Sequence, residues 1–284
     1  MIVTRFAPSP TGYLHLGHAF AAITARETAV RSSGRFLLRI EDIDSGRCKP
    51  EFQAAIFEDL AWLGLRWEEP VLRQSTRLEA YRAALDRLGS MGVVYPCFCT
   101  RGDIAAEIAR AVEAPHGPEG PHYPGTCRKL SDTERRSRLE SGTPCAFRLN
   151  VTKASGLAGA MSFEERGAGL SGETGTIAVD PLLFGDIVIA RKDVPTSYHL
   201  AVVVDDAHQG VTLVTRGNDL FPATHVQRLL QTLLGLPAPA YAHHRLILDE
   251  HGWKFSKRDR AVTLRSLRQS GVMPEKIRGR LGLR

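Results

Sequence analysis

The segment RFAPSPTGYLHLGH, residues 5–18, constrains the fold of this chain more than any other stretch. Residues 1–6 before it are mostly apolar and predict a short strand, and residues 19–29 after it consist largely of good helix formers and predict a helix. The Pro, Ser and Gly residues between them indicate a strand-to-helix connection. Because α/β folds bind nucleotides at such connections, we expect an α/β fold with a nucleotide site here.

Two histidines lie in this connection. His15 and His18 are three residues apart and fall on one face of a first helical turn, where unpaired backbone N–H groups and the helix dipole favour an anion. Gly17 between them carries no side chain, so a phosphate or a flat base could approach the backbone closely. The plainer alternative is an ordinary loop followed by a capped helix.

The composition is that of a globular protein. The 284 residues include 43% hydrophobic and 24% charged residues, which excludes extensive disorder and leaves room for one large domain or two smaller ones. The N-terminus has no basic segment followed by an apolar one, and no apolar run is long enough to span a membrane. We therefore expect a cytoplasmic protein without a membrane partner.

The net charge of +6 is concentrated near the end of the chain. Residues 245–284 contain 11 Lys and Arg against 4 Asp and Glu, a balance of +7 that leaves −1 for the rest. A basic surface of this kind suits a polyanion such as ATP or RNA, whereas the plainer interpretation is a solvated end.

The five cysteines, an odd number in a chain without an export signal, do not indicate a disulfide framework. Cys97, Cys99 and Cys127 are soft ligands suited to tetrahedral zinc, which needs a fourth donor. Four protein ligands would leave no open position, so we expect a structural site. The alternative is a set of reduced, buried cysteines without a metal.

Acidic residues follow the second predicted strand. Residues 35–40 have a strand pattern, and Glu41, Asp42 and Asp44 come directly after them. The carboxyl ends of parallel strands are where α/β sheets bind ligands, so these carboxylates are candidates for a binding site. Helix capping or a weak cation site are the alternatives.

Four motifs together resemble the glutamate branch of class I aminoacyl-tRNA synthetases. Residues 5–18 resemble its signature, with HLGH at 15–18 in the place of the HIGH motif. The others are RIEDID at 39–44, YHLAVVVDD at 198–206 followed by RGND at 216–219, and KFSKR at 254–258 in the place of the KMSKS motif. The resemblance covers nearly the whole chain and is weakest at 151–175.

This resemblance implies a Rossmann-like class I catalytic domain with a zinc-stapled insertion and a short helical C-terminal end. We expect the first half of the nucleotide-binding domain at 1–95, the insertion at 96–180, the second half at 181–250, and the KFSKR loop with a basic helical tail at 251–284. About 26 residues follow the KFSKR motif, and we expect no anticodon-binding domain.

The resemblance also implies roles for individual residues. The expected catalytic residues are His15, His18 and Lys257, and the expected ATP-binding residues are His15, Gly17, His18, Lys254, Ser256 and Lys257. The expected glutamate-binding residues are Arg5, Phe6, Ala7, Pro8, Ser9, Glu41, Tyr198 and Arg216, with Glu41 binding the ammonium group. The expected zinc ligands are Cys97, Cys99, Tyr123 and Cys127, with His122 and His116 as alternatives to the tyrosine.

The implied function is the activation of L-glutamate by ATP and Mg²⁺ as glutamyl-adenylate. The short chain resembles truncated paralogues of glutamyl-tRNA synthetase that transfer glutamate to queuosine in the anticodon of tRNA(Asp), and we expect a monomer with one structural Zn²⁺. The alternatives are a minimal glutamyl-tRNA synthetase that charges the 3′ end of tRNA(Glu), a small-molecule nucleotidyltransferase, and a non-enzymatic zinc and RNA-binding module.

Overall fold

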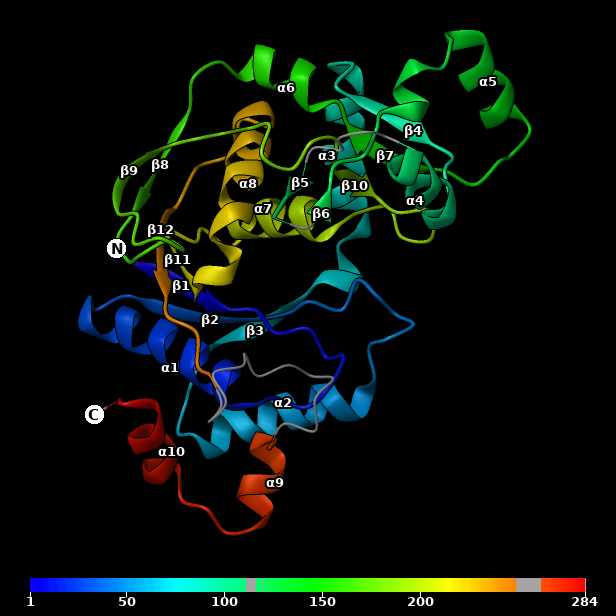
Figure 1. Ribbon diagram of the computed structural model, residues 1–284. Coiled ribbons are helices and arrows are strands. Elements are labelled where there is room, and N and C mark those ends of the chain that lie inside the picture. The colour runs from blue at the N-terminus through cyan, green and yellow to red at the C-terminus, as the bar shows by residue number, and fades with distance from the viewer. Residues whose placement is uncertain (111–115, 119, 249–261, 284) are drawn as a thin grey trace.

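Parallel strands form the centre of the computed structural model, which describes residues 1–110, 116–118, 120–248 and 262–283 (Figure 1). The first sheet is parallel and has the order β1 (Val3–Phe6), β2 (Arg35–Ile40), β3 (Glu68–Arg73). The second has the order β11 (Leu213–Gly217), β12 (Ala240–His244), β8 (Ser162–Glu165), β9 (Gly175–Ala178), with only β9 antiparallel. A backbone hydrogen bond of 3.0 Å from Thr212 N to Val3 O joins the two sheets.

Helices cover both faces of these sheets (Figure 1). One face carries α1 (Leu16–Arg31), α2 (Pro50–Trp62), α9 (Leu264–Gln269) and α10 (Pro274–Leu281). The other carries α3 (Leu78–Ser90), α6 (Val151–Ala158), α7 (Tyr198–His208) and α8 (Phe221–Leu233). The short helices η1 (Gln74–Thr76) and η3 (Asn218–Leu220) come directly before α3 and α8. Each layer buries its own apolar core, as expected of a doubly wound α/β fold.

The predicted strand-to-helix connection at residues 5–18 is confirmed. β1 ends at Phe6, and α1 begins at Leu16 with His15 as its N-cap. After α1, Gly34 passes against the start of β1, where a Cβ atom would lie only 2.1 Å from Ile2 O. Only glycine allows this close return from α1 to β2.

A third, antiparallel sheet of order β10 (Val188–Ala190), β7 (Ala146–Leu149), β4 (Val94–Cys97) extends to one side. Around it lie α4 (Arg101–Arg110), β5 (His116–Gly117), β6 (Gly120–Pro121), η2 (Thr126–Lys129) and α5 (Asp132–Glu140). The expected insertion at 96–180 includes most of these elements. It also includes β8 and β9, which instead extend the second parallel sheet through β12, so the division into domains stays a proposal.

The class of fold and the predicted elements agree with the structure, including the two short C-terminal helices. Residues 151–175, where the resemblance is weakest, contain α6 and β8. In the described part of the chain, we find no helix that combines the length and the apolar character needed to cross a bilayer.

Candidate active site

The two histidines cap the N-terminus of α1 reciprocally. His15 Nδ1 accepts from Gly17 N–H at 3.1 Å, and His18 Nδ1 accepts from His15 N–H at 3.2 Å. Their rings lie 3.8 Å apart between centroids. In each ring the Nδ1 atom is therefore an acceptor, which leaves the proton of the neutral ring on Nε2, where it can be donated to an anion.

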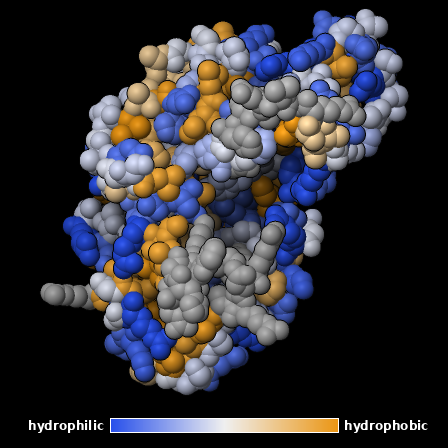
Figure 2. All heavy atoms as spheres, viewed as in Figure 1, coloured by the Kyte–Doolittle hydropathy of each residue, from blue (hydrophilic) through white to orange (hydrophobic). Residues whose placement is uncertain are grey.

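Gly17 leaves room for the His15 ring in this capping arrangement. A Cβ atom at residue 17 would lie 3.1 Å from His15 Cε1 and 3.2 Å from His15 Nδ1, so it would push the ring away. The histidines and Gly17 line a cavity of about 230 Å³ together with residues at and just after the ends of β11 and β12, including Asp219 and His244. Figure 2 shows that this face of the molecule is hollowed between its two halves. The cavity places a helix N-terminus beside the carboxyl ends of parallel strands, as nucleotide binding requires.

The C-terminal segment returns to this motif. Leu264 N–H donates to Leu14 O at 2.7 Å, and Thr263 forms an isolated β-bridge with His15. Lys254, Ser256 and Lys257, the expected ATP-binding residues of the KFSKR motif, lie outside the described residues. The chain that follows them is thus tied to Leu14 and His15.

A buried cluster of charges lies at the ends of β1 and β2. Asp206, on α7, accepts from Arg5 Nε at 3.0 Å and from Arg39 Nη1 at 2.7 Å. Arg39 also donates through Nη2 to Glu41 Oε1 at 3.2 Å. The side chains of Arg5 and Arg39 are 5% and 0% exposed, so their charges depend on these carboxylates for compensation.

Burial acts differently on the two carboxylates of this cluster. Burial opposes the charged form of Asp206, but the two guanidinium groups outweigh it and lower the pKa of Asp206. Burial raises the pKa of Glu41 despite the nearby charges of Arg39 and Arg5. The negative charge of Glu41 is thus less well compensated than that of Asp206. A bound cationic group such as an ammonium would stabilise the charged form of Glu41 more than that of Asp206.

Tyr198 and Arg216, expected to bind the same substrate, lie together. Arg216 Nη1 is 3.4 Å from Tyr198 Oη and donates to Gln227 Oε1 at 2.8 Å. Arg216 also donates to Thr224 Oγ1 at 2.7 Å and to His243 Nε2 at 3.0 Å. This arginine, on β11, is 6% exposed and held from several directions.

The other expected glutamate-binding residues lie at the end of β1 and on the loop after it. Phe6 and Pro8 are buried, with the side chain of Phe6 in the apolar core, and Ala7 and Ser9 are partly exposed. Phe6 therefore offers a ligand its backbone more readily than its ring.

Sequence reasoning missed three polar groups around these arginines. It assigned no role to Asp206, Arg39 or Gln227, although the first two stand inside quoted motifs. The adjacent acidic pair at 205 and 206 was the available signal, because buried carboxylates need cationic partners. Asp205 indeed ties α7 to α3, accepting from Arg77 Nε and Tyr81 Oη at 2.7 Å each.

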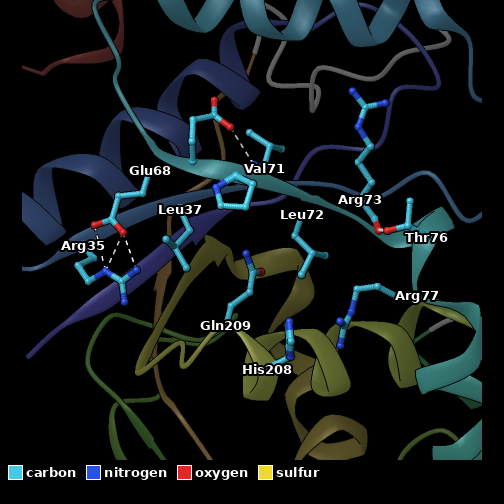
Figure 3. A pocket seen from close by; sticks show the side chains of 12 residues that line it. Arg35, Leu37, Glu68, Val71, Leu72, Arg73, Thr76, Arg77, His208 and Gln209 are labelled. Carbon is cyan, nitrogen blue, oxygen red and sulfur yellow. Dashed lines mark hydrogen bonds and ion pairs between the residues drawn. The ribbon is translucent and has the colours of Figure 1, made fainter.

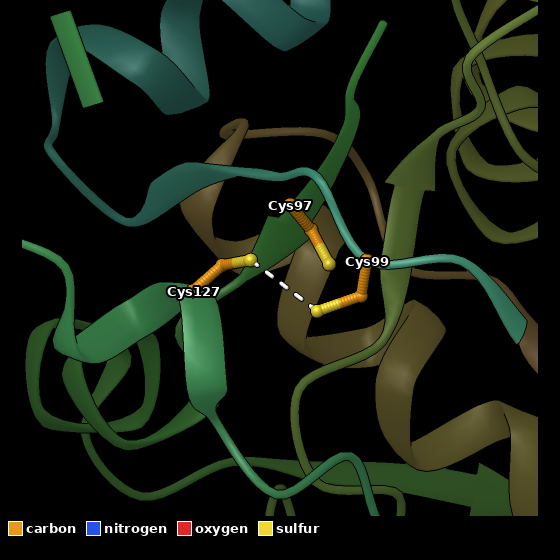
Figure 4. Close-up of side chains that lie close together, drawn as sticks. All are labelled: Cys97, Cys99 and Cys127. Carbon is orange, nitrogen blue, oxygen red and sulfur yellow. Dashed lines mark hydrogen bonds between the residues drawn. The ribbon is translucent and has the colours of Figure 1, made fainter. Parts of the chain in front are cut away.

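The expected metal ligands also converge. The Sγ atoms of Cys97, Cys99 and Cys127 lie within 4.8 Å of one another and point toward a common centre (Figure 4). Tyr123 Oη lies 3.5 Å from Cys97 Sγ and 3.4 Å from Cys99 Sγ. Four donors spaced in this way fit a tetrahedral zinc ion bound at about 2.3 Å from sulfur. The cluster can hold a metal.

Neighbouring residues favour Tyr123 over the alternative donors. His122 Nε2 lies 3.0 Å from Leu183 O, so this ring is occupied elsewhere, and the side chain of His116 lies outside the described residues. Arg148 donates to Cys97 Sγ at 3.3 Å and stacks on the Tyr123 ring at 3.9 Å. Its positive charge offsets the negative charge that deprotonated ligands bring to the site.

A larger cavity of about 620 Å³ lies beside β3 and the end of α7, where Gln209 accepts from Arg39 Nη1 at 3.0 Å (Figure 3). Its charged residues are engaged locally, since Arg35 pairs with Glu68 and Arg77 pairs with Asp205. We therefore assign the chemistry to the smaller cavity at the two histidines.

Comparison with known proteins gives a consistent result. The family described as "tRNA synthetases class I (E and Q), catalytic domain" matches residues 1–284. A protein of Rhodobacter capsulatus named glutamyl-Q tRNA(Asp) synthetase is 50% identical, over 99% of this chain and 100% of that protein. A protein of Nocardia farcinica with the same name is 45% identical, over 96% of this chain and 81% of that protein.

Longer proteins match as well. The glutamate–tRNA ligase of Aquifex aeolicus is 42% identical over 97% of this chain but only 55% of its own length. The crystal structure of a glutamate tRNA ligase from Elizabethkingia meningosepticum, in complex with its amino acid, superposes with a TM-score of 0.75 at 30% identity. It covers 91% of this chain and 52% of the ligase, so the chain spans about half the length of these ligases.

Proposed function

The chain belongs to the family of class I tRNA synthetase catalytic domains for glutamate and glutamine, and we propose that it activates L-glutamate with ATP and transfers it to queuosine in tRNA(Asp). The observation that carries the proposal is the full-length, 50% identical relative named for that reaction. The two histidines that cap α1 and the buried Arg5 and Arg216 support the first half of the reaction.

In this proposal the buried arginines select glutamate. Arg216 and Arg5 are fixed guanidinium groups on β11 and β1, and a guanidinium donates charge-assisted hydrogen bonds to a carboxylate. Glutamine would leave the buried charge of Arg216, whose partners among the described residues are all neutral, without compensation, so discrimination follows from charge rather than size. Glu41 binds the ammonium group, and Tyr198 lies beside Arg216.

Activation is an in-line displacement at phosphorus. An oxygen of the glutamate α-carboxylate forms a bond to the α-phosphorus of ATP, and the bond to the departing pyrophosphate breaks. His15 and His18, at the N-terminus of α1, stabilise the negative charge that develops on the phosphates. The ammonium group of Lys257 stabilises the charge that accumulates on the departing pyrophosphate. No protein nucleophile is required.

Metal ions have two separate roles in the proposal. Mg²⁺ accompanies ATP and screens its phosphates. Cys97, Cys99, Tyr123 and Cys127 would hold one structural Zn²⁺, which would tie η2 to the end of β4.

The acceptor is tested by incubating the protein with ATP, labelled glutamate and tRNA(Asp) with or without queuosine. We expect label in the anticodon only when queuosine is present, and we expect it to appear also on tRNA(Asp) from which the 3′ terminal adenosine has been removed. Label on the 3′ end of tRNA(Glu), lost when the terminal adenosine is removed, would identify a minimal glutamate–tRNA ligase instead. If no pyrophosphate exchange depends on glutamate, the activation step itself is refuted.

A further inference from the structure

We propose that Glu165 and His243 are positioning residues for glutamate recognition, because together they fix the orientation of the Arg216 guanidinium. The proposal rests on the proposed function, in which Arg216 binds glutamate. It concerns three strands that come from distant parts of the sequence: β8 carries Glu165, β11 carries Arg216 and β12 carries His243.

A continuous chain of hydrogen bonds joins the three side chains. Glu165 Oε2 lies 2.5 Å from His243 Nδ1, and Arg216 Nε donates to His243 Nε2 at 3.0 Å. The side chains of Glu165 and His243 are both 0% exposed. Strand register enforces the second contact, since Arg216 pairs directly with His243 across β11 and β12.

The chain of donors and acceptors determines which tautomer His243 adopts. A guanidinium N–H can only donate, so His243 Nε2 must present its lone pair to Arg216. The imidazole proton must then reside on Nδ1, where the Glu165 carboxylate accepts it. Burial and the charge of Arg216 lower the pKa of His243, while Glu165 opposes this shift. A neutral His243 is the form that can accept from Arg216.

Glu165 is itself held by the backbone. Its Oε1 atom accepts from His243 N–H at 2.9 Å and from Gly167 N–H at 2.8 Å. Only Oε2 therefore faces the imidazole ring. The carboxylate cannot rotate without losing two buried backbone hydrogen bonds, so it is a rigid support for the tautomer.

The consequence for Arg216 is a guanidinium plane fixed at both ends. Besides His243, it donates to Gln227, Thr224 and Tyr198. These bonds, the ones in the described residues, use four of its five N–H donors, and the fifth, on Nη2, is left to meet a carboxylate. Binding to a charged substrate is strongest when the group is already oriented, because no reorganisation is needed.

The variant Glu165→Gln tests this arrangement with almost no change in shape. The two backbone N–H groups hold the amide oxygen at the Oε1 position, so the amide nitrogen faces His243 Nδ1 and donates to it. The imidazole proton then lies on Nε2, where it points toward the Arg216 N–H, so the hydrogen bond between these two groups is lost. We expect the KM for glutamate in pyrophosphate exchange to rise about tenfold or more, with the KM for ATP within about twofold of wild type.

Two comparisons separate positioning from general stability. The control Glu164→Gln alters the exposed neighbour on the same strand, which pairs with Arg166 at the surface, and both KM values should stay unchanged. His243→Gln can still accept from Arg216 and donate to Glu165, so it should retain most glutamate affinity, whereas His243→Leu should lose it. Thermal melting establishes that each variant compared is folded.

The outcomes are distinct. Wild-type protein without glutamate-dependent exchange would refute the proposed function. If wild-type protein exchanges normally and folded Glu165→Gln keeps its KM for glutamate, the positioning role is overturned. An equal rise in the KM values for glutamate and ATP would assign Glu165 a structural role only, and this result would also overturn the positioning role.

Discussion

Replacing Asp206 by Asn should destabilise the protein more than any change to a surface ion pair. Asp206 accepts from Arg5 at 3.0 Å and from Arg39 at 2.7 Å, and both arginines are at most 5% exposed. The substitution removes one negative charge between two buried positive ones and places an amide N–H against a guanidinium donor. Breaking a buried ion pair by removing one partner costs about 3–5 kcal/mol, and we expect a loss in this range.

Urea unfolding followed by tryptophan fluorescence measures the effect, with Glu68→Gln as the matched control. Glu68 forms an ion pair with Arg35 in which both side chains are 43% exposed, so solvent screens it and its loss should change the midpoint only slightly. An Asp206→Asn midpoint as close to wild type as that of Glu68→Gln would refute the reasoning.

The same variant should change the dependence of stability on pH. The pKa of Asp206 is lowered in the folded protein, so its contribution is fully present above the unfolded value of about 3.9 and is lost as the pH falls through the folded value. The difference between wild type and Asp206→Asn should therefore be constant near neutrality and shrink in acid below about pH 4. A difference that grows on acidification would contradict the assignment.

Three further predictions follow from the proposed site. Lys257→Ala should lower the rate of glutamate-dependent pyrophosphate exchange about 10²- to 10³-fold, as loss of a group that stabilises transition-state charge does, and near-normal exchange would remove its role. Elemental analysis of the purified protein should find one zinc ion per chain. The Cys127→Ser variant should lose this zinc, whereas the control Cys48→Ser should keep it. Zinc retained by both variants would refute the proposed ligand set. Gly17→Ala should displace the His15 ring, destabilise the protein by about 1 kcal/mol on thermal melting and slow pyrophosphate exchange. The control Gly279→Ala should leave the melting temperature unchanged or raise it, because nothing lies within 4 Å of the added Cβ in this helix.

Local sequence was sufficient to predict the elements that depend on nearby residues. The connection from β1 to α1, the pair of histidines at the helix start and the cysteine cluster all follow from spacing within short segments. Capping and turn formation are decided within a few residues, so the sequence carries that information directly.

The pairing of buried charges was decided by tertiary structure alone. Arg5 and Asp206 are 201 residues apart, and Glu165 and His243 are 78 apart. Glu165 lies within residues 151–175, where the resemblance is weakest. It nevertheless supports Arg216, the arginine expected to bind glutamate, through its contact with His243. Which carboxylate meets which arginine depends on the order and register of strands in the completed sheet, and no local sequence pattern encodes that geometry.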